Sequence, residues 1–125
     1  PETRVRNAFF DPKLAEARLA AAVSPEDEDI RLKNHFTTAK LAWSPRFYNP
    51  DLAKWLHRID VPTMILWGAA DKIFPPALGE EYHRLIAGSE LRIIAECGHL
   101  PQHEKLADFL SGVDAITTGA TNGAG

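Results

Sequence analysis

Two short apolar runs, with a helical pattern between them, constrain the fold of this chain more than any other feature. The first run is Val61–Trp67, which Gly68 closes, and the second is Leu91–Ala95. Nearly continuous apolar runs of this length are typical of parallel strands that are buried on both faces. The residues from Pro76 to about Ile86 predict a helix between the two strands, and Gly88 follows as a stop signal. The pattern therefore predicts an α/β fold built on one strand–helix–strand unit.

The first 60 residues show helical patterns and no strand pattern. Residues 11–21 predict a helix, in which Asp11 caps the first turn and Pro12 occupies the first helical position. A second, longer helix begins after Ser24 by the same device, and a third begins near Asp51. Four apolar residues recur along the second helix at spacings of four, three and four, which predicts one buried stripe: Leu32, Phe36, Ala39 and Trp43.

The C-terminal residues predict a last helix from about Pro101 to Gly112 and then a small polar tail without order. We therefore divide the chain into a helical segment at 1–49, an α/β segment at 50–114 and a disordered tail at 115–125. Two parallel strands with apolar faces do not form a stable sheet by themselves. The sequence thus predicts neighbouring strands that it does not contain, as in the C-terminal part of a larger protein.

Composition excludes several classes of function. The net charge of −3 leaves no basic stripe, so we expect neither nucleic acid nor an acidic membrane surface as a partner. No apolar run approaches the roughly 20 residues of a membrane helix, and the start has no signal pattern. Cys97 is the single cysteine of the chain, so no internal disulfide can form. This usage fits a reducing compartment, and we expect the cytoplasm.

Each predicted strand is followed by a residue that suits acid–base chemistry, at the edge where parallel sheets build their sites. Asp71 follows the first strand, where an aspartate either makes a local Asx turn or accepts a hydrogen bond from a histidine on the neighbouring loop. His99 follows the second strand after Gly98, which we expect to turn the backbone sharply there. A neutral imidazole can take and return a proton near pH 7, as acyl transfer requires. The pairing favours the functional interpretation of both residues over a turn and a surface histidine.

The other chemically active residues favour structural roles. His99 and His103 have a metal-like spacing, but Pro101 interrupts a helix through both and no third ligand is near, so we expect no metal. Cys97 fits a small buried packing residue, and Glu104 fits the positive end of the last helix dipole. The aromatic residues of segment 12–48 predict either core packing, the commoner case, or the wall of an apolar substrate pocket.

Two stretches resemble the α/β-hydrolase fold superfamily: Leu56 to Pro76, with its Val-Pro-Thr start and Trp-Gly-x-x-Asp turn, and Ser89 to Glu104, with its Gly-His-x-Pro-x-x-Glu end. The resemblance covers about residues 50–113, and it implies that 1–49 is a helical cap remnant and 50–114 a C-terminal segment of the α/β-hydrolase core. It implies that Asp71 is the acid and His99 the base of a catalytic triad. We expect no cofactor. The resemblance also implies a nucleophile elbow and an oxyanion hole that no residue here matches. The four serines, at positions 24, 44, 89 and 111, all lie outside a Gly-x-Ser-x-Gly motif.

The resemblance leaves the reaction open, because the missing nucleophile decides it. We expect hydrolysis of a small apolar carboxylic ester or a similar acyl substrate. The alternatives are carbon–carbon hydrolysis of the meta-cleavage type, and dehalogenase or epoxide chemistry with an aspartate nucleophile. The partner that completes the site is then the missing N-terminal part of the same protein, and this chain alone is predicted to be inactive. An alternative of another class is a truncated binding module without turnover.

Overall fold

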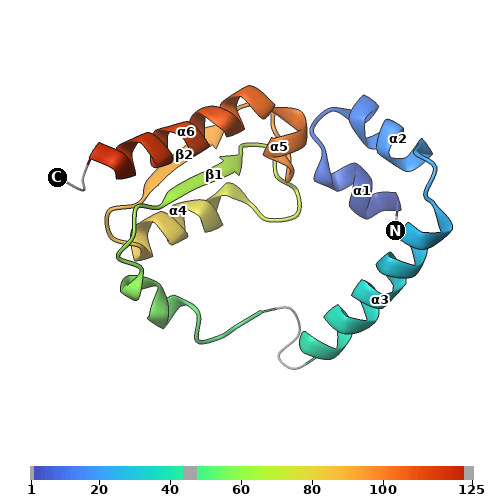
Figure 1. Cartoon of the computed structure of the whole chain (residues 1–125), viewed down its shortest axis with the longest axis horizontal. Helices are drawn as coiled ribbons and strands as arrows, with labels where there is room; N and C mark the ends of the chain where they lie inside the picture. The colour runs from blue at the N-terminus through green and yellow to red at the C-terminus, as the bar shows by residue number, and fades with distance from the viewer. Residues whose placement is uncertain (1, 44–47, 123–125) are drawn as a thin grey trace.

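The computed structural model describes residues 2–43 and 48–122, and for 119–122 it describes the backbone alone. Figure 1 shows a helical first half that curves away from a small α/β unit in the second half. The elements in chain order are α1 (Glu2–Ala8), α2 (Pro12–Ala20), α3 (Pro25–Leu41), the 3-10 helix η1 (Ala53–Arg58), β1 (Met64–Gly68), α4 (Pro76–Leu85), β2 (Glu90–Ile94), α5 (Pro101–Glu104) and α6 (Leu106–Asn122).

The two strands form one parallel sheet, as the apolar runs predict. Met64 lies opposite Glu90 and Gly68 lies opposite Ile94. Helix α4 covers one face of the sheet and α6 covers the other (Figure 1). Because the strands run in the same direction, both end at the same edge of the sheet, and the loops that follow them begin side by side.

The N-terminal helices begin where the capping signals predict. Asp11 Oδ1 accepts a hydrogen bond from the Lys13 amide at 2.8 Å, and Ser24 Oγ accepts one from the Asp27 amide at 3.0 Å. These bonds satisfy amides that have no partner within their helices. The sequence patterns gave no signal for α1, which packs against α2.

A small apolar cluster joins the helical half to the α/β unit. Ala8, Phe9 and Ala15 are buried, and Ile73 and Leu100 pack against them. Ile73 belongs to the loop after β1, and Leu100 to the loop after β2. The cluster therefore places the α1–α2 connection directly against the two loops that carry Asp71 and His99.

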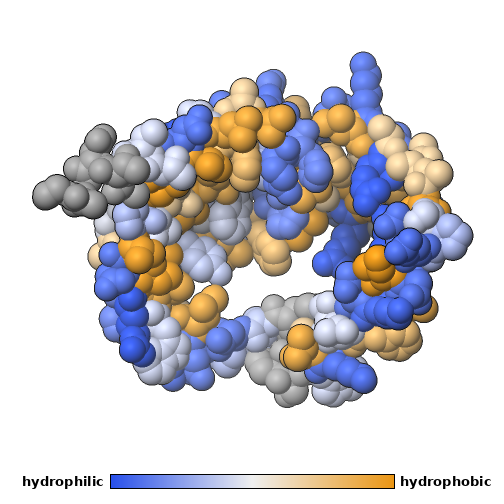
Figure 2. Space-filling view, in the orientation of Figure 1, coloured by the Kyte–Doolittle hydropathy of each residue, from blue (hydrophilic) through white to orange (hydrophobic). Residues whose placement is uncertain are grey.

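The apolar stripe of α3 is helical, as predicted, but it is not buried. No residue of α3 is buried, and the exposed fraction of Phe36 is 63%. Leu32 and Trp43 are also more than half exposed. Figure 2 shows apolar side chains at the surface over α6 and over the helical half. A stripe predicts which residues share a face, but burial requires a partner element that packs closely over that face. Phe47, which lies in the aromatic segment, and Ser44 lie outside the described residues.

Two predictions near the chain end are corrected by the structure. The last helix is divided, because Lys105 is not helical (φ −135°, ψ 57°), and α6 then continues to Asn122. Residues 115–122 are therefore helical rather than disordered. The physical reason is burial: Ala115 and Ile116 are half-buried, and Ile116 extends the apolar surface that α6 presents to β1. No helix among the described residues is long and apolar enough to span a bilayer.

Candidate active site

Asp71 uses its two carboxylate oxygens for two different tasks. Oδ1 accepts hydrogen bonds from the amides of Ile73 and Phe74, at 2.8 and 2.9 Å, which makes an Asx turn after β1. Oδ2 accepts a hydrogen bond from His99 Nδ1 at 2.8 Å. The side chain of Asp71 is only 4% exposed. The turn and the histidine contact, which the sequence offered as alternatives, are thus both present, and the turn fixes the carboxylate that faces the ring.

The imidazole of His99 is held from one side and open on the other. A carboxylate accepts hydrogen bonds and donates none when ionised, so Nδ1 must carry the proton in this bond. The ring of Phe74 lies 5.4 Å from the ring of His99, measured between centroids, at a tilt of 59°. The side chain of His99 stays 32% exposed. With Nδ1 committed to Asp71, Nε2 is the nitrogen available for proton transfer.

The two loops approach each other too closely for a side chain at Gly68. A Cβ built on Gly68 would lie 2.0 Å from the carbonyl oxygen of Gly98 and 2.5 Å from that of Cys97. Just beyond this contact, the Ala70 amide donates to the Cys97 carbonyl oxygen at 2.9 Å. In the loop after β2, the residue with a left-handed backbone conformation is Glu96 (φ +50°). The sharp turn predicted at Gly98 is therefore two residues earlier.

Glu104 is the site residue whose role sequence reasoning missed. The sequence predicts a structural role at a helix dipole, whereas the hydrogen bonds of this carboxylate go to other segments of the chain. It accepts hydrogen bonds from three backbone amides, those of Gly98, Phe10 and Asp11. The Gly-His-x-Pro-x-x-Glu spacing was the available signal, because a one-turn helix that begins at Pro101 returns Glu104 toward the loop of His99.

The other candidate residues lie apart from this pair. His83 of α4 contacts Ser89 through Nδ1 and Oγ at 2.9 Å. Ser24 caps α3, and Ser111 faces Arg92. Among the described residues, therefore, no serine bonds His99. In the same part of the chain, no group of three or more histidine, cysteine, aspartate or glutamate side chains is placed to hold a metal ion.

Cys97 lies next to the site but does not provide a nucleophile. It is completely buried, and its Sγ contacts the Gly98 carbonyl oxygen at 3.6 Å. Burial raises the pKa of the thiol from 9.0 to about 11, and the negative charge of Glu104 adds to this effect. The thiol is therefore protonated at neutral pH, and its role as a buried packing residue is confirmed.

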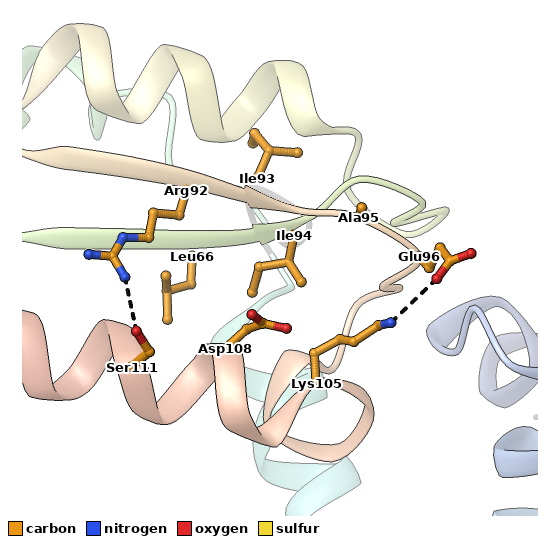
Figure 3. Close-up of a pocket in the computed structure, with 9 residues that line it drawn as sticks. All are labelled: Leu66, Arg92, Ile93, Ile94, Ala95, Glu96, Lys105, Asp108 and Ser111. Carbon is orange, nitrogen blue, oxygen red and sulfur yellow. Dashed lines mark hydrogen bonds and ion pairs between the residues drawn. The ribbon is translucent and has the colours of Figure 1, made fainter.

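The pocket between β2 and α6 is separate from the Asp71–His99 pair. Its volume is about 390 Å³, and neither member of the pair lines it. Figure 3 shows that Arg92 points toward the hydroxyl of Ser111 and Lys105 toward the carboxylate of Glu96, so both basic side chains of the wall already have a partner. Among the residues that line this pocket, no nucleophile contacts a base.

Comparison with known proteins agrees with this geometry. A family model described as the alpha/beta hydrolase fold matches residues 3–106. The chain belongs to the alpha/beta hydrolase fold family. The parallel strands, with helices on both faces and a candidate acid and base on their C-terminal loops, form part of that fold.

Two kinds of curated relatives match this part of the fold. A 2-hydroxy-6-oxononadienedioate/2-hydroxy-6-oxononatrienedioate hydrolase of Klebsiella pneumoniae subsp. pneumoniae is 38% identical over 96 residues, which are 77% of this chain and 31% of the relative. The protein of the same name from Escherichia coli (strain K12 / DH10B) is 37% identical over 96 residues, again 77% of this chain and 31% of the relative. A pimeloyl-[acyl-carrier protein] methyl ester esterase of Neisseria meningitidis serogroup B (strain H44/76) is 39% identical over 66 residues, 53% of this chain and 23% of the relative. The chain thus spans about a third or less of the relatives it matches.

Proposed function

We propose that Asp71 and His99 are the acid and base of a hydrolase that transfers an acyl group to water, with a nucleophile supplied by another part of the protein. The observation that carries this proposal is the 2.8 Å contact between Nδ1 of His99 and Oδ2 of Asp71, at the C-terminal ends of adjacent parallel strands. A buried carboxylate that orients a half-exposed imidazole is the arrangement that a hydroxyl nucleophile needs beside it.

The chemistry follows from the two ring nitrogens of His99. Nε2 takes the proton of the nucleophile as it attacks the acyl carbon, and the Asp71 carboxylate stabilises the positive ring that forms. The ring then gives this proton to the leaving group. In the second half of the reaction, Nε2 takes a proton from the water that attacks the acyl-enzyme, and the ring returns this proton to the nucleophile as its bond to the acyl carbon breaks.

The surface along β1 supports a further part of the protein as the source of the nucleophile. A groove of about 500 Å³ runs between β1 and α6, and its walls include Met64, Leu66, Phe109 and Val113. Such walls favour cover by apolar side chains. The small extent of the match, 31% of the first relative, also supports this interpretation. We propose that the partner is the N-terminal part of the same protein.

For the substrate we propose a small apolar carboxylic ester. The match to a methyl ester esterase supports this choice. The second candidate is hydrolysis of a carbon–carbon bond next to a carbonyl group, and the longer match, over 96 residues, to hydrolases named for 2-hydroxy-6-oxo-dienedioates favours it. The same acid and base serve both reactions, which differ in whether the leaving atom is oxygen or carbon. The fold alone does not decide between them.

The test begins with the gene around the codon for Pro1. If the frame continues upstream into a Gly-x-Ser-x-Gly elbow, the whole protein is assayed on p-nitrophenyl butyrate and on 2-hydroxy-6-oxononadienedioate. His99→Ala is expected to lower kcat by about 10⁴-fold to 10⁶-fold, and Asp71→Asn by about 10⁴-fold, because the wrong tautomer is then favoured. His103→Ala, at an exposed neighbouring position, serves as the matched control.

Each outcome distinguishes a hypothesis. Equal activity of the His99→Ala variant and the unsubstituted protein would refute the proposal. An elbow that carries aspartate would replace ester hydrolysis with dehalogenase or epoxide chemistry. A protein that is complete at this length and inert on both substrates would favour the binding module without turnover.

A further inference from the structure

Three backbone amides from two distant segments converge on the carboxylate of Glu104. Oε1 accepts a hydrogen bond from the Gly98 amide at 2.9 Å. Oε2 accepts hydrogen bonds from the Phe10 amide at 2.7 Å and from the Asp11 amide at 3.2 Å. The first amide belongs to the loop of His99, and the other two belong to the connection between α1 and α2. One ionised side chain therefore ties the helical half to the loop that carries the candidate base.

A second bond holds the next amide of the same loop. The amide of His99 donates to the carbonyl oxygen of Ala8 at 2.8 Å. The space around Gly98, where the His99 loop meets the α1–α2 connection, is filled, since a Cβ on Gly98 would lie 2.7 Å from the Ala8 oxygen and 2.8 Å from Glu104 Oε1. The two successive amides before the Cα of His99, those of Gly98 and His99 itself, are thus held by segment 8–11, through Glu104 and directly.

We infer that Glu104 is a positioning residue for His99, which sets the direction of the imidazole by binding the His99 loop to the α1–α2 connection. The inference rests on the proposed function, in which His99 is the base. Without the Oε1 contact, the Gly98 amide loses its acceptor, and the backbone before His99 shifts on its two remaining bonds, from the His99 amide to Ala8 and from the Ala70 amide to Cys97. The ring then leaves the position in which Nδ1 reaches Asp71 at 2.8 Å. A displacement of segment 8–11 has the same effect, so the position of the helical half controls the geometry of the base.

The substitution Glu104→Gln tests this inference with little change in volume. Gln keeps one carbonyl oxygen but places an NH₂ group against backbone N–H donors, so one of the two segments loses its acceptor. Glu96→Gln is the matched control, because Glu96 lies in the same loop, carries the same charge and is 73% exposed in its side chain. Asp71→Asn gives the reference signal for a ring that has lost its partner.

The readout is the Nδ1 proton of His99 in NMR spectra of the isotope-labelled chain, together with exchange of the Gly98 and Phe10 amides. In Glu104→Gln we expect the ring-proton signal to broaden or vanish as in Asp71→Asn, and exchange of at least one of these amides to rise by about tenfold or more. Glu96→Gln is expected to leave both unchanged. A Glu104→Gln chain with faster amide exchange but an unchanged ring signal would overturn the inference, since Glu104 would then hold only the backbone.

Two further measurements keep the inference testable if Glu104→Gln does not fold. Glu104→Asp keeps the charge but is one methylene too short to reach both segments, and the same loss of ring signal is expected. In the unsubstituted chain, the ring proton and the three amides are expected to open together, with protection factors within about threefold of one another. Independent opening would refute the coupling. The readout needs no turnover, so an inactive protein that shows this behaviour would refute the proposed function and leave the positioning role intact.

Discussion

Replacing Gly68 with alanine tests the close approach of the two strand ends at the candidate site. The new methyl group would lie 2.0 Å from the Gly98 carbonyl oxygen and 2.8 Å from the carbonyl carbon of Cys97. Both are backbone atoms, so no rotation of a side chain relieves the clash. The oxygen would have to move by about 1.4 Å to reach an ordinary contact distance of 3.4 Å.

This displacement is large enough to affect both stability and the site. Overpacking typically costs about 1–3 kcal/mol, and the rigid backbone on both sides places this case near 3 kcal/mol. For a chain of this size, that cost lowers the melting temperature by roughly 12 °C. A shift of about 1 Å also exceeds the tolerance of a hydrogen bond, so we expect His99 to lose its contact with Asp71.

Gly88→Ala provides the control for the loss of glycine itself. Gly88 has a positive φ of 74° with nothing within 4 Å of an added Cβ. Its substitution is expected to cost about 1 kcal/mol through backbone strain alone, with no change at the site. Thermal unfolding followed by circular dichroism gives the stabilities, and the Nδ1 proton signal of His99 reports the contact. If Gly68→Ala is as stable as Gly88→Ala and keeps this signal, the argument from close approach is refuted.

Three further predictions concern the rest of the chain. The buried thiol of Cys97, whose pKa is raised to about 11, is expected to resist iodoacetamide at pH 8 until urea unfolds the chain, and rapid alkylation of the folded chain would contradict this burial. Because the thiol of the unfolded chain ionises near pH 9, the urea concentration at the unfolding midpoint should fall as the pH rises from 9 to 11. Ser24→Ala removes the acceptor of the Asp27 amide and should destabilise α3 by about 1 kcal/mol, so an unchanged helix signal in circular dichroism would count against the cap. Lysine at Leu32 and Phe36 together should lower the binding of an apolar fluorescent dye, and undiminished fluorescence would place the exposed surface elsewhere.

Local signals in the sequence predicted the parts of the fold that depend on a few neighbouring residues. Caps at Asp11 and Ser24 depend on one side chain and an amide two or three residues away, so the sequence located both helix starts. The two apolar runs predicted parallel strands for a similar reason, because a short continuous apolar run is a property of neighbouring residues. Residues 115–122 of the tail were mispredicted, because the small polar residues near Thr117 continue a helix whose preceding residues, Ala115 and Ile116, are half-buried; residues 123–125 lie outside the described part of the chain.

By itself, the sequence determined that Asp71 and His99 follow adjacent parallel strands, and therefore that their loops begin at one edge of a sheet. Only the tertiary structure decided that one oxygen of Asp71 makes the turn while the other meets the imidazole, and that Glu104 binds amides 93 and 94 positions away. Tertiary structure likewise left the stripe of α3 exposed, with Phe36 on its surface. The physical reason is that periodicity fixes which side chains share a face, whereas a hydrogen bond or a buried contact requires atoms from distant segments to reach the same point, and no local pattern records where those segments meet.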